Sequence, residues 1–283
     1  MIETSDNKRK NELTVAAVVA VAMVLLVAFV TQQSQYIRAT AIANQPPRNN
    51  YLPIAVFPDF SSVPNVAVKK QLFFDFFQDY VRDENQTILG LRKDLLSYAD
   101  ITRKGWMLSP SERSRVLEIA ESYKLELTFS NEAEVIEELV QRVDIIPPSL
   151  ALAQAATESA WGTSRFALEG NNVFGQWCYT KGCGIVPSRR PSGAIHEVET
   201  FSTIKSSVQA YFVNINTNDV YQHLRDQRAQ MRARGHEVDS MILAAGLGRY
   251  SERGDNYVDE VQVIITQNDL LKRDQGLGDN PLY

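Results

Sequence analysis

The chain has 283 residues, of which 44% are hydrophobic, and a formal net charge of −5. This length and composition suit one large or two modest globular domains with a hydrophobic core. Lysine and arginine are scattered evenly along the sequence, so it lacks the basic stripe that nucleic-acid binding requires. DNA and RNA are therefore excluded as partners.

The first marked feature is the apolar run from Leu13 to Val30, which contains no charged residue and no glycine. Its 18 residues are just long enough to cross a bilayer core about 30 Å thick, at about 1.5 Å per residue. The basic residues at 8–10 predict a cytoplasmic N-terminus over 1–12 and place the rest of the chain outside the cytoplasm. We expect a transmembrane anchor at 13–30; the alternatives are a buried core helix and a cleaved signal peptide.

The segment after the anchor, residues 31–64, contains five prolines, which disfavour regular structure and predict a stalk. From Asn65 to Asp100, apolar residues recur at helical spacing, which predicts one long amphipathic helix with Gly90 as a point of interruption. A stripe on this helix predicts a packing surface rather than a binding site. It consists of Leu72, Phe73, Phe76, Phe77, Tyr80 and Val81.

Two more helices are predicted before residue 145. Ser109, Pro110 and Glu112 have the spacing of an N-cap, a first helical proline and a capping box. A second start lies at Ser130, where acidic residues in the first turn suit the helix dipole. Together with the long helix they predict a helical N-terminal region over 65–145.

The next segment is an alanine-rich helix that begins at Pro147-Pro148 and ends on a single acid, Glu158. Gln154 lies one turn before this acid, and most of the neighbouring side chains on that face are apolar. A carboxyl group held against apolar side chains has a raised pKa, as a general acid near neutral pH requires. The alternative is a glutamate at the exposed end of a helix.

The only two cysteines, Cys178 and Cys183, flank the turn signal Lys181-Gly182, which makes a disulfide across a short hairpin sterically reasonable. A metal site is the alternative, but it would need two more ligands. The nearby sequence "HEVET" has Thr200 where a zinc-binding HExxH motif has its second histidine. We expect a disulfide and no metal.

Apolar residues at 195, 198 and 201 alternate with polar ones, which predicts a strand of a small hairpin. Glu197 and Glu199 lie two residues apart on this strand, so both point to the same face. A helix is predicted after Thr203, with Val208, Tyr211 and Phe212 inward. Another follows from 219, with a basic face that we expect to be solvated.

Several ordered blocks around Glu158 resemble one enzyme family. They are Glu158-Ser159, Trp161-Gly162, Ser-Arg-Phe-Ala at 164–167 and Gly-Asn-Asn-Val-Phe-Gly at 170–175. Their order is similar to the glucosaminidases of glycoside hydrolase family 73, within the lysozyme-like superfamily. The block "GQWCYTKGCGIVP" at 175–187 resembles the Bax-type group of that family, found in Gram-negative bacteria. The resemblance implies a mainly α, lysozyme-like helical domain over 146–272, with a small β-hairpin lobe beside a sugar cleft. We expect a flexible tail at 273–283.

Carried over by residue, the resemblance implies that Glu158 is the proton donor to the glycosidic oxygen. Asn172, Phe174 and Gly175 would form the floor of the sugar cleft. Tyr250 and Tyr257 match two tyrosines of a family block, Tyr250 as a catalytic and Tyr257 as a substrate-binding residue. The spacing between them is longer than in the family by about two residues, because the chain reads Ser-Glu-Arg-Gly-Asp there. The aromatic residues available to stack on sugar rings are Trp161, Phe174, Trp177 and Tyr179.

Glycosidases usually pair two carboxylates, and the family carries its second acid in the β-lobe. Glu197, preferred, and Glu199 fall in that window. The alternatives are that both are solvent-facing strand residues, or that the substrate's own acetamido group takes part.

The resemblance implies an endo-β-N-acetylglucosaminidase that cleaves the β-1,4 bond on the reducing side of N-acetylglucosamine in peptidoglycan glycan strands. It would work without a cofactor, in the periplasm of a Gram-negative bacterium, tethered to the inner membrane through residues 13–30. Two alternatives stay open: a lytic transglycosylase, and an inactive membrane-tethered module that binds glycan. No protein partner is indicated.

Overall fold

The computed structural model describes residues 57–126 and 132–276. The predicted anchor at 13–30, the stalk up to residue 56 and the predicted helix start at Ser130 lie outside the described residues. Within the described residues, no helix is both long enough and apolar enough to cross a membrane.

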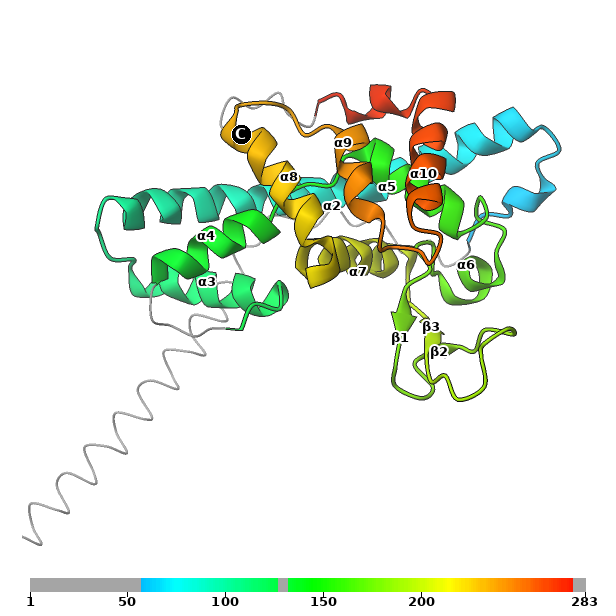
Figure 1. Ribbon diagram of the computed structural model, residues 1–283, viewed down its shortest axis with the longest axis horizontal. Coiled ribbons are helices and arrows are strands. Elements are labelled where there is room, and N and C mark those ends of the chain that lie inside the picture. The colour runs from blue at the N-terminus through cyan, green and yellow to red at the C-terminus, as the bar shows by residue number, and fades with distance from the viewer. Residues whose placement is uncertain (1–56, 127–131, 277–283) are drawn as a thin grey trace, which may run out of the picture. The chain divides into compact units, whose positions relative to one another are not determined.

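The described residues form a mainly helical unit with one small sheet (Figure 1). Its helices are α2 (Val66–Arg103), α3 (Pro110–Ser122), α4 (Glu132–Arg142), α5 (Pro148–Glu158), α6 (Arg165–Gly170), α7 (Ile204–Thr217), α8 (Gln222–Ala233), α9 (Ser240–Ala244) and α10 (Asp255–Gln267). Short 3₁₀ segments are η1 (Phe60–Ser62), η2 (Asp219–Tyr221), η3 (Ala245–Leu247) and η4 (Leu270–Asp274).

Helix α2 begins after Asn65, whose side chain accepts a hydrogen bond from the backbone N–H of Val68 (3.1 Å). It runs unbroken through Gly90, because packing against α4, α5 and α7 outweighs the roughly 1 kcal/mol that a mid-helix glycine costs. The predicted packing stripe is buried at Phe73, Phe77 and Val81. Leu72, however, is 46% exposed, and Phe74 lies in the core in its place.

The folded region begins earlier than the predicted end of the stalk. Phe60 is 4% exposed, and its ring centroid lies 5.4 Å from that of Phe73. Phe57 packs against Phe77 with a centroid distance of 5.9 Å. Residues 57–64 therefore belong to the folded unit, because these two phenylalanines complete the aromatic side of α2.

The structure describes the predicted start of α3 at Ser109, but the predicted start of the next helix at Ser130 lies outside the described residues. Helix α3 has the predicted capping box: Ser109 accepts from the backbone N–H of Glu112, and the carboxylate of Glu112 accepts from the N–H of Ser109. Helix α4 carries Glu132 and Glu134 in its first turn. Both helices pack on α2.

Helix α5 lies at the centre of the fold, in contact with α2, α9, α10 and η4. Its residues from Pro148 to Ala156 are all buried, and its many alanines let neighbouring backbones come close. Its N-cap residue is Pro147, which makes no side-chain hydrogen bond to the helix. Instead, the carboxylate of Asp274 accepts hydrogen bonds from the backbone N–H (2.7 Å) and hydroxyl (2.6 Å) of Ser149, which supplies the cap from a distant segment.

The folded region also extends past residue 272, where a flexible tail was predicted to begin. Asp274 caps α5 through Ser149. The guanidinium of the neighbouring Arg273 forms an ion pair with Asp75 of α2 (2.6 Å) and donates to the side-chain oxygen of Gln78. These contacts fasten η4 to both α2 and α5, so order continues at least through residue 274.

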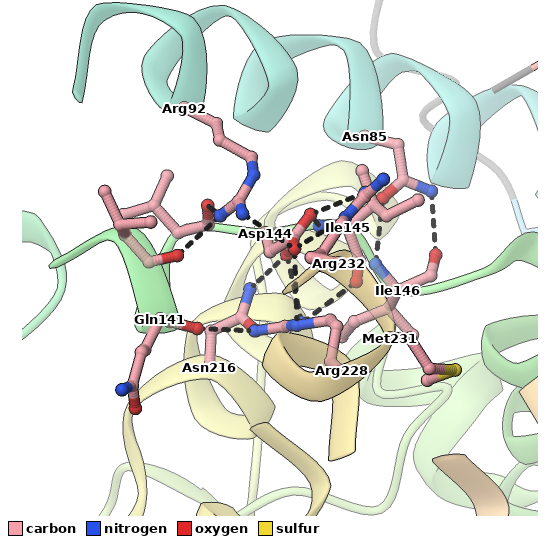
Figure 2. Close-up of polar contacts among 12 residues, drawn as sticks. Asn85, Arg92, Gln141, Asp144, Ile145, Ile146, Asn216, Arg228, Met231 and Arg232 are labelled. Carbon is pink, nitrogen blue, oxygen red and sulfur yellow. Dashed lines mark hydrogen bonds and ion pairs between the residues drawn. The ribbon is translucent and has the colours of Figure 1, made fainter. Parts of the chain in front are cut away.

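A buried polar network holds the linker between α4 and α5. Figure 2 shows Arg92 reaching from α2 and Arg228 and Arg232 from α8, with Asp144 between them. Arg232 donates to both oxygens of Asp144 (2.9 and 3.1 Å), and Arg92 lies 3.4 Å from the same carboxylate. Burial opposes ionisation of Asp144, but the arginines hold its pKa below the ordinary value.

The same network saturates the backbone of the linker. Arg228 donates to the carbonyl oxygens of Gln141 (3.0 Å) and Ile145 (2.9 Å), and Asn85 makes paired hydrogen bonds with the backbone of Ile146 (2.8 and 3.1 Å) (Figure 2). Arg228 is 1% exposed, so the prediction of a solvated basic face on this helix was wrong. The free carbonyls at the end of α4 need donors, and long arginine side chains supply them.

The sheet consists of β1 (Trp177–Cys178), β2 (Gly184–Ile185) and β3 (Glu197–Glu199), in the antiparallel order β1-β3-β2. Figure 1 shows the strands gathered at one edge, next to α6. The predicted disulfide between Cys178 and Cys183 is confirmed. It closes the loop that joins β1 to β2 and so supports a sheet with few residues per strand.

Candidate active site

Glu158 is the last residue of α5, at the point where this buried helix reaches the surface, and it is partly exposed. Gly175 lies directly beside it with a φ of +64°, and a Cβ at that position would lie 2.9 Å from Oε2 of Glu158. A side chain there would press on the carboxylate, so glycine is required for both the backbone conformation and the close approach.

A chain of hydrogen bonds holds the carboxylate of Glu158 from inside the protein. The hydroxyl of Tyr211 donates to Oε1 of Gln154 (2.7 Å), and Nε2 of Gln154 donates to the hydroxyl of Tyr257 (3.1 Å). Because the hydroxyl of Tyr257 accepts from Gln154, its own proton is available to Glu158, and a side-chain hydrogen bond between the two lowers the pKa of Glu158. Because Gln154 lies one turn before Glu158 on α5, the rigid helix fixes the separation of the two groups.

Burial raises the pKa of Glu158 to about 7. The hydrogen bond from Tyr257 and the positive charge of Arg253 lower it, and the negative charge of Glu260 raises it, but desolvation dominates. The sequence predicted this apolar environment and its effect. A carboxyl group with this pKa is protonated in a substantial fraction of molecules at neutral pH, as proton donation requires.

Tyr250 and Tyr257 lie together, with parallel rings 5.4 Å apart. The hydroxyl of Tyr250 donates to the carbonyl oxygen of Phe174 (2.7 Å), which fixes the loop beside Glu158. Tyr257 is fully buried. Its predicted direct contact with substrate is therefore not supported by the geometry, because its hydroxyl faces Glu158 and Gln154 inside the protein.

The loop from Asn172 to Gln176 is organised by Asn172. Its Oδ1 accepts from the N–H groups of Phe174 (3.3 Å) and Gln176 (3.1 Å), and its Nδ2 donates to the carbonyl oxygens of Gln176 and Glu199 (2.9 Å each). Phe174 stacks on Tyr211 at 3.9 Å. Asn172 and Phe174 are buried, so they support the site from beneath, while Gly175 lies at its edge.

The two candidate second carboxylates have different surroundings. The carboxylate of Glu197 accepts from the backbone N–H groups of Gly182 (3.1 Å to each oxygen) and Gly184 (2.9 Å), which lowers its pKa. It fastens the disulfide loop onto β3. Glu199 is partly exposed, and burial raises its pKa although the charge of Lys124 opposes this.

The predicted stacking aromatics separate into two groups. Trp177 (50% exposed) and Tyr179 are at the surface of the small sheet, and Trp177 stacks on His196 at 4.1 Å. Trp161 packs against Phe74 and beneath Lys70, so it belongs to the core side of α2. No group of three or more potential metal ligands occurs among the described residues.

The comparison with known proteins bears on what these residues do. The chain is 33% identical to Protein bax of Escherichia coli (strain K12) over 214 residues, which are 76% of this chain and 75% of that protein. Residues 133–270 match the glucosaminidase family, described as mannosyl-glycoprotein endo-beta-N-acetylglucosaminidase. The chain belongs to this glucosaminidase family. The catalytic domain of the autolysin Auto from Listeria monocytogenes is a looser structural match, with a TM-score of 0.39, 14% identity, and coverage of 85% of this chain and 97% of that domain.

Membership of the glucosaminidase family supports a glycoside hydrolase. The family match begins at residue 133, within α4, so the match does not include α2 and α3. Three residues around Glu158 were not assigned to the site from the sequence: Gln154, Tyr211 and Arg253. Only Gln154 had a signal in the sequence, which was its spacing of one helical turn from Glu158.

Replacing Tyr257 by phenylalanine tests the hydrogen-bond chain that ends at Glu158. The hydrogen bond lowers the pKa of Glu158, so its loss should raise that pKa and move the alkaline limb of kcat/KM to higher pH. We expect kcat to fall about 10-fold as well, because the carboxylate loses its internal donor. The pH–rate profile measures both effects. A Tyr98→Phe variant, on α2, is the control, and an unmoved limb in Tyr257→Phe would contradict the assignment.

Proposed function

We propose that the chain is an endo-β-N-acetylglucosaminidase that cleaves the β-1,4 bond on the reducing side of N-acetylglucosamine in peptidoglycan glycan strands, with Glu158 as the general acid. The observation that carries the proposal is a single partly exposed carboxyl group at the end of a buried helix, with a pKa of about 7 and an internal tyrosine donor. The lysozyme-like fold implied by the sequence fits the mainly helical unit with its small sheet.

In the proposed reaction, protonated Glu158 gives its proton to the glycosidic oxygen as the bond to the sugar C1 breaks. The resulting carboxylate is anionic, and the hydrogen bond from Tyr257 then stabilises it better than the neutral acid. Tyr211 and Gln154 keep that tyrosine oriented. The protein thus needs no cofactor for this step.

The geometry favours Glu199 over Glu197 as the second carboxylate of the reaction. The carboxylate of Glu197 is occupied by three backbone hydrogen-bond contacts, whereas no hydrogen bond occupies the carboxylate of Glu199 among the described residues. The backbone of Glu199 is also tied to Asn172 (2.9 Å), which couples the strand to the loop beside Glu158. This reverses the order preferred from the sequence.

Paired substitutions at these two positions test the choice. Glu199→Gln should lower kcat by about 10²-fold or more, because it removes the group that attacks C1 or activates water. Glu197→Gln should instead lower the melting temperature and reduce kcat less than about 10-fold, because it weakens a loop fastening that stands apart from the chemistry. Kinetics and thermal unfolding are measured on both. A larger kcat loss in Glu197→Gln would restore the opposite order.

We also propose that residues 13–30 anchor the enzyme in the inner membrane and that the folded unit works in the periplasm. Both follow from the apolar run and the basic residues before it. Fractionation of cells, followed by protease treatment of spheroplasts, tests this placement. Digestion of the folded unit from the outside is expected, and protection would contradict it.

The reaction itself is tested on purified peptidoglycan with the full chain. Released fragments are reduced with borohydride and identified by mass spectrometry. Reduced N-acetylglucosamine ends from the wild type, absent with Glu158→Gln, are the expected products. Anhydro ends would identify a transglycosylase, and glycan binding without any cleavage would identify a binding module.

A further inference from the structure

A positively charged side chain lies beside the candidate acid without a role in the proposed chemistry. Arg253 belongs to the turn between η3 and α10, in the Ser-Glu-Arg-Gly-Asp stretch. Its guanidinium carbon lies 5.2 Å from the centre of the Tyr257 ring, in a cation–π contact. The hydroxyl of Tyr257 is hydrogen-bonded to Glu158, so only the side chain of Tyr257 separates Arg253 from the acid.

The guanidinium of Arg253 is fixed but only partly used. Nη1 forms an ion pair with Glu260, and Nε donates to the hydroxyl of Ser251 (3.4 Å). In the part of the chain that the structure describes, Nη2 has no hydrogen-bond partner, and the side chain is 50% exposed. A planar guanidinium presents five donors and binds a carboxylate with two parallel hydrogen bonds. The site therefore offers an oriented cation whose Nη2 group is free to donate hydrogen bonds to a ligand.

The chemistry of the proposed substrate places an acid next to this cation. In the bond between N-acetylglucosamine and N-acetylmuramic acid, Glu158 protonates O4 of the muramic acid. The neighbouring oxygen of that same sugar, O3, carries the lactyl ether. When the peptide is still attached, the lactyl carbonyl is a neutral amide; when an amidase-class reaction has hydrolysed that amide, the lactyl group ends in a free carboxylate.

From this geometry we propose that Arg253 binds the lactyl carboxylate of the leaving muramic acid and so makes the enzyme selective for glycan strands from which the peptides have been removed. The proposal rests on the proposed function, because it uses the position of the scissile bond. It places the enzyme after an amidase-class reaction. Protonated Glu158 is neutral, so it does not repel the incoming carboxylate, and the ion pair with Glu260 keeps the guanidinium in place.

The test compares kcat/KM of the full chain on peptide-free glycan strands, on peptide-bearing strands and on chitin oligosaccharides, which have the same β-1,4 bond without a lactyl group. The measured quantity is the ratio of kcat/KM on peptide-free strands to that on chitin oligosaccharides. This ratio cancels any effect of Arg253 on Glu158 itself. In Arg253→Gln we expect the ratio to fall about 10-fold, as loss of a charge-assisted hydrogen bond predicts, with partial recovery in Arg253→Lys.

Arg249→Gln is the matched control, because Arg249 is exposed and lies in the same turn; its ratio should equal that of the wild type. An equal loss on both substrates in Arg253→Gln would overturn the proposal and assign Arg253 to the acid. A loss confined to peptide-bearing strands would overturn it in favour of a peptide carboxylate.

Binding separates this proposal from the proposed function. Glu158→Gln and the double variant Glu158→Gln/Arg253→Gln are titrated with peptide-free strands, and the double variant should bind about 10-fold more weakly. Equal binding by the two would overturn the role of Arg253. If the wild type cleaves none of the three substrates, the proposed function fails, but the binding comparison still tests whether Arg253 holds a carboxylate.

Discussion

Replacing Glu158 by glutamine should lower kcat on peptidoglycan strands about 10³-fold, within the range expected for loss of a general acid. Glutamine keeps the shape of the side chain and can still accept the hydrogen bond from Tyr257, but it has no transferable proton. The melting temperature should stay close to the wild-type value or rise slightly, because a charge that burial disfavours is removed. Initial rates and thermal unfolding of the same preparations measure the two effects.

The pH dependence gives an independent check on the same residue. A general acid is active while protonated, so with a pKa of about 7 for Glu158, kcat/KM should fall tenfold per pH unit well above neutrality. Any residual activity of Glu158→Gln should lack this limb. A variant that keeps more than about a tenth of the wild-type rate, with its alkaline limb intact, would exclude Glu158 as the acid.

Replacing Asp144 by asparagine should lower the free energy of unfolding by about 3–5 kcal/mol, the usual cost of removing one partner from a buried ion pair. The guanidinium groups of Arg92, Arg228 and Arg232 would then share a buried site without a counter-charge. Their hydrogen bonds to the linker before α5 would also lose the charge that orients them. Urea denaturation measures the change as a lower midpoint with an unchanged slope.

Asp259→Asn is the matched control, because that carboxylate is exposed on α10 and its loss should change stability by less than about 0.5 kcal/mol. The pH dependence has a defined sign. The folded-state pKa of Asp144 is below its ordinary value, so its contribution is fully present above about pH 4 and is lost as the pH falls through the folded value. A loss below about 1 kcal/mol at neutral pH would show that the arginines need no counter-charge, contrary to our expectation.

Local chemistry explains which elements were predictable. The capping box of Ser109 and Glu112, the disulfide and the alanine-rich helix ending at Glu158 all depend on residues that are neighbours in sequence. Caps, turns and short-range pairs bring their own partners with them. The apolar surroundings of Glu158 were predictable for the same reason, since the helix itself supplies them.

Other features depend on partners that lie far along the chain. In the sequence Arg228 lies on the polar face of a helix, but in the structure it donates to carbonyl oxygens at 141–145. No local sequence pattern reveals that a distant carbonyl lacks a donor. Glu197 and Glu199 share a face of β3, and only the path of the disulfide loop makes one of them a structural anchor. Tyr257 was matched by motif, but its burial depends on how α10 packs against α5.

The enclosure of α5 has a consequence for how such an enzyme can diversify. Its alanines are buried, and inserting extra methylenes into a packed core typically costs about 1–3 kcal/mol. The helix that carries Glu158 is therefore nearly closed to change. New substrate preferences must therefore come from the segments around this helix, such as the 172–176 loop, the disulfide loop and the turn at 248–254. The sequences of these segments can vary while the position of Glu158 is kept.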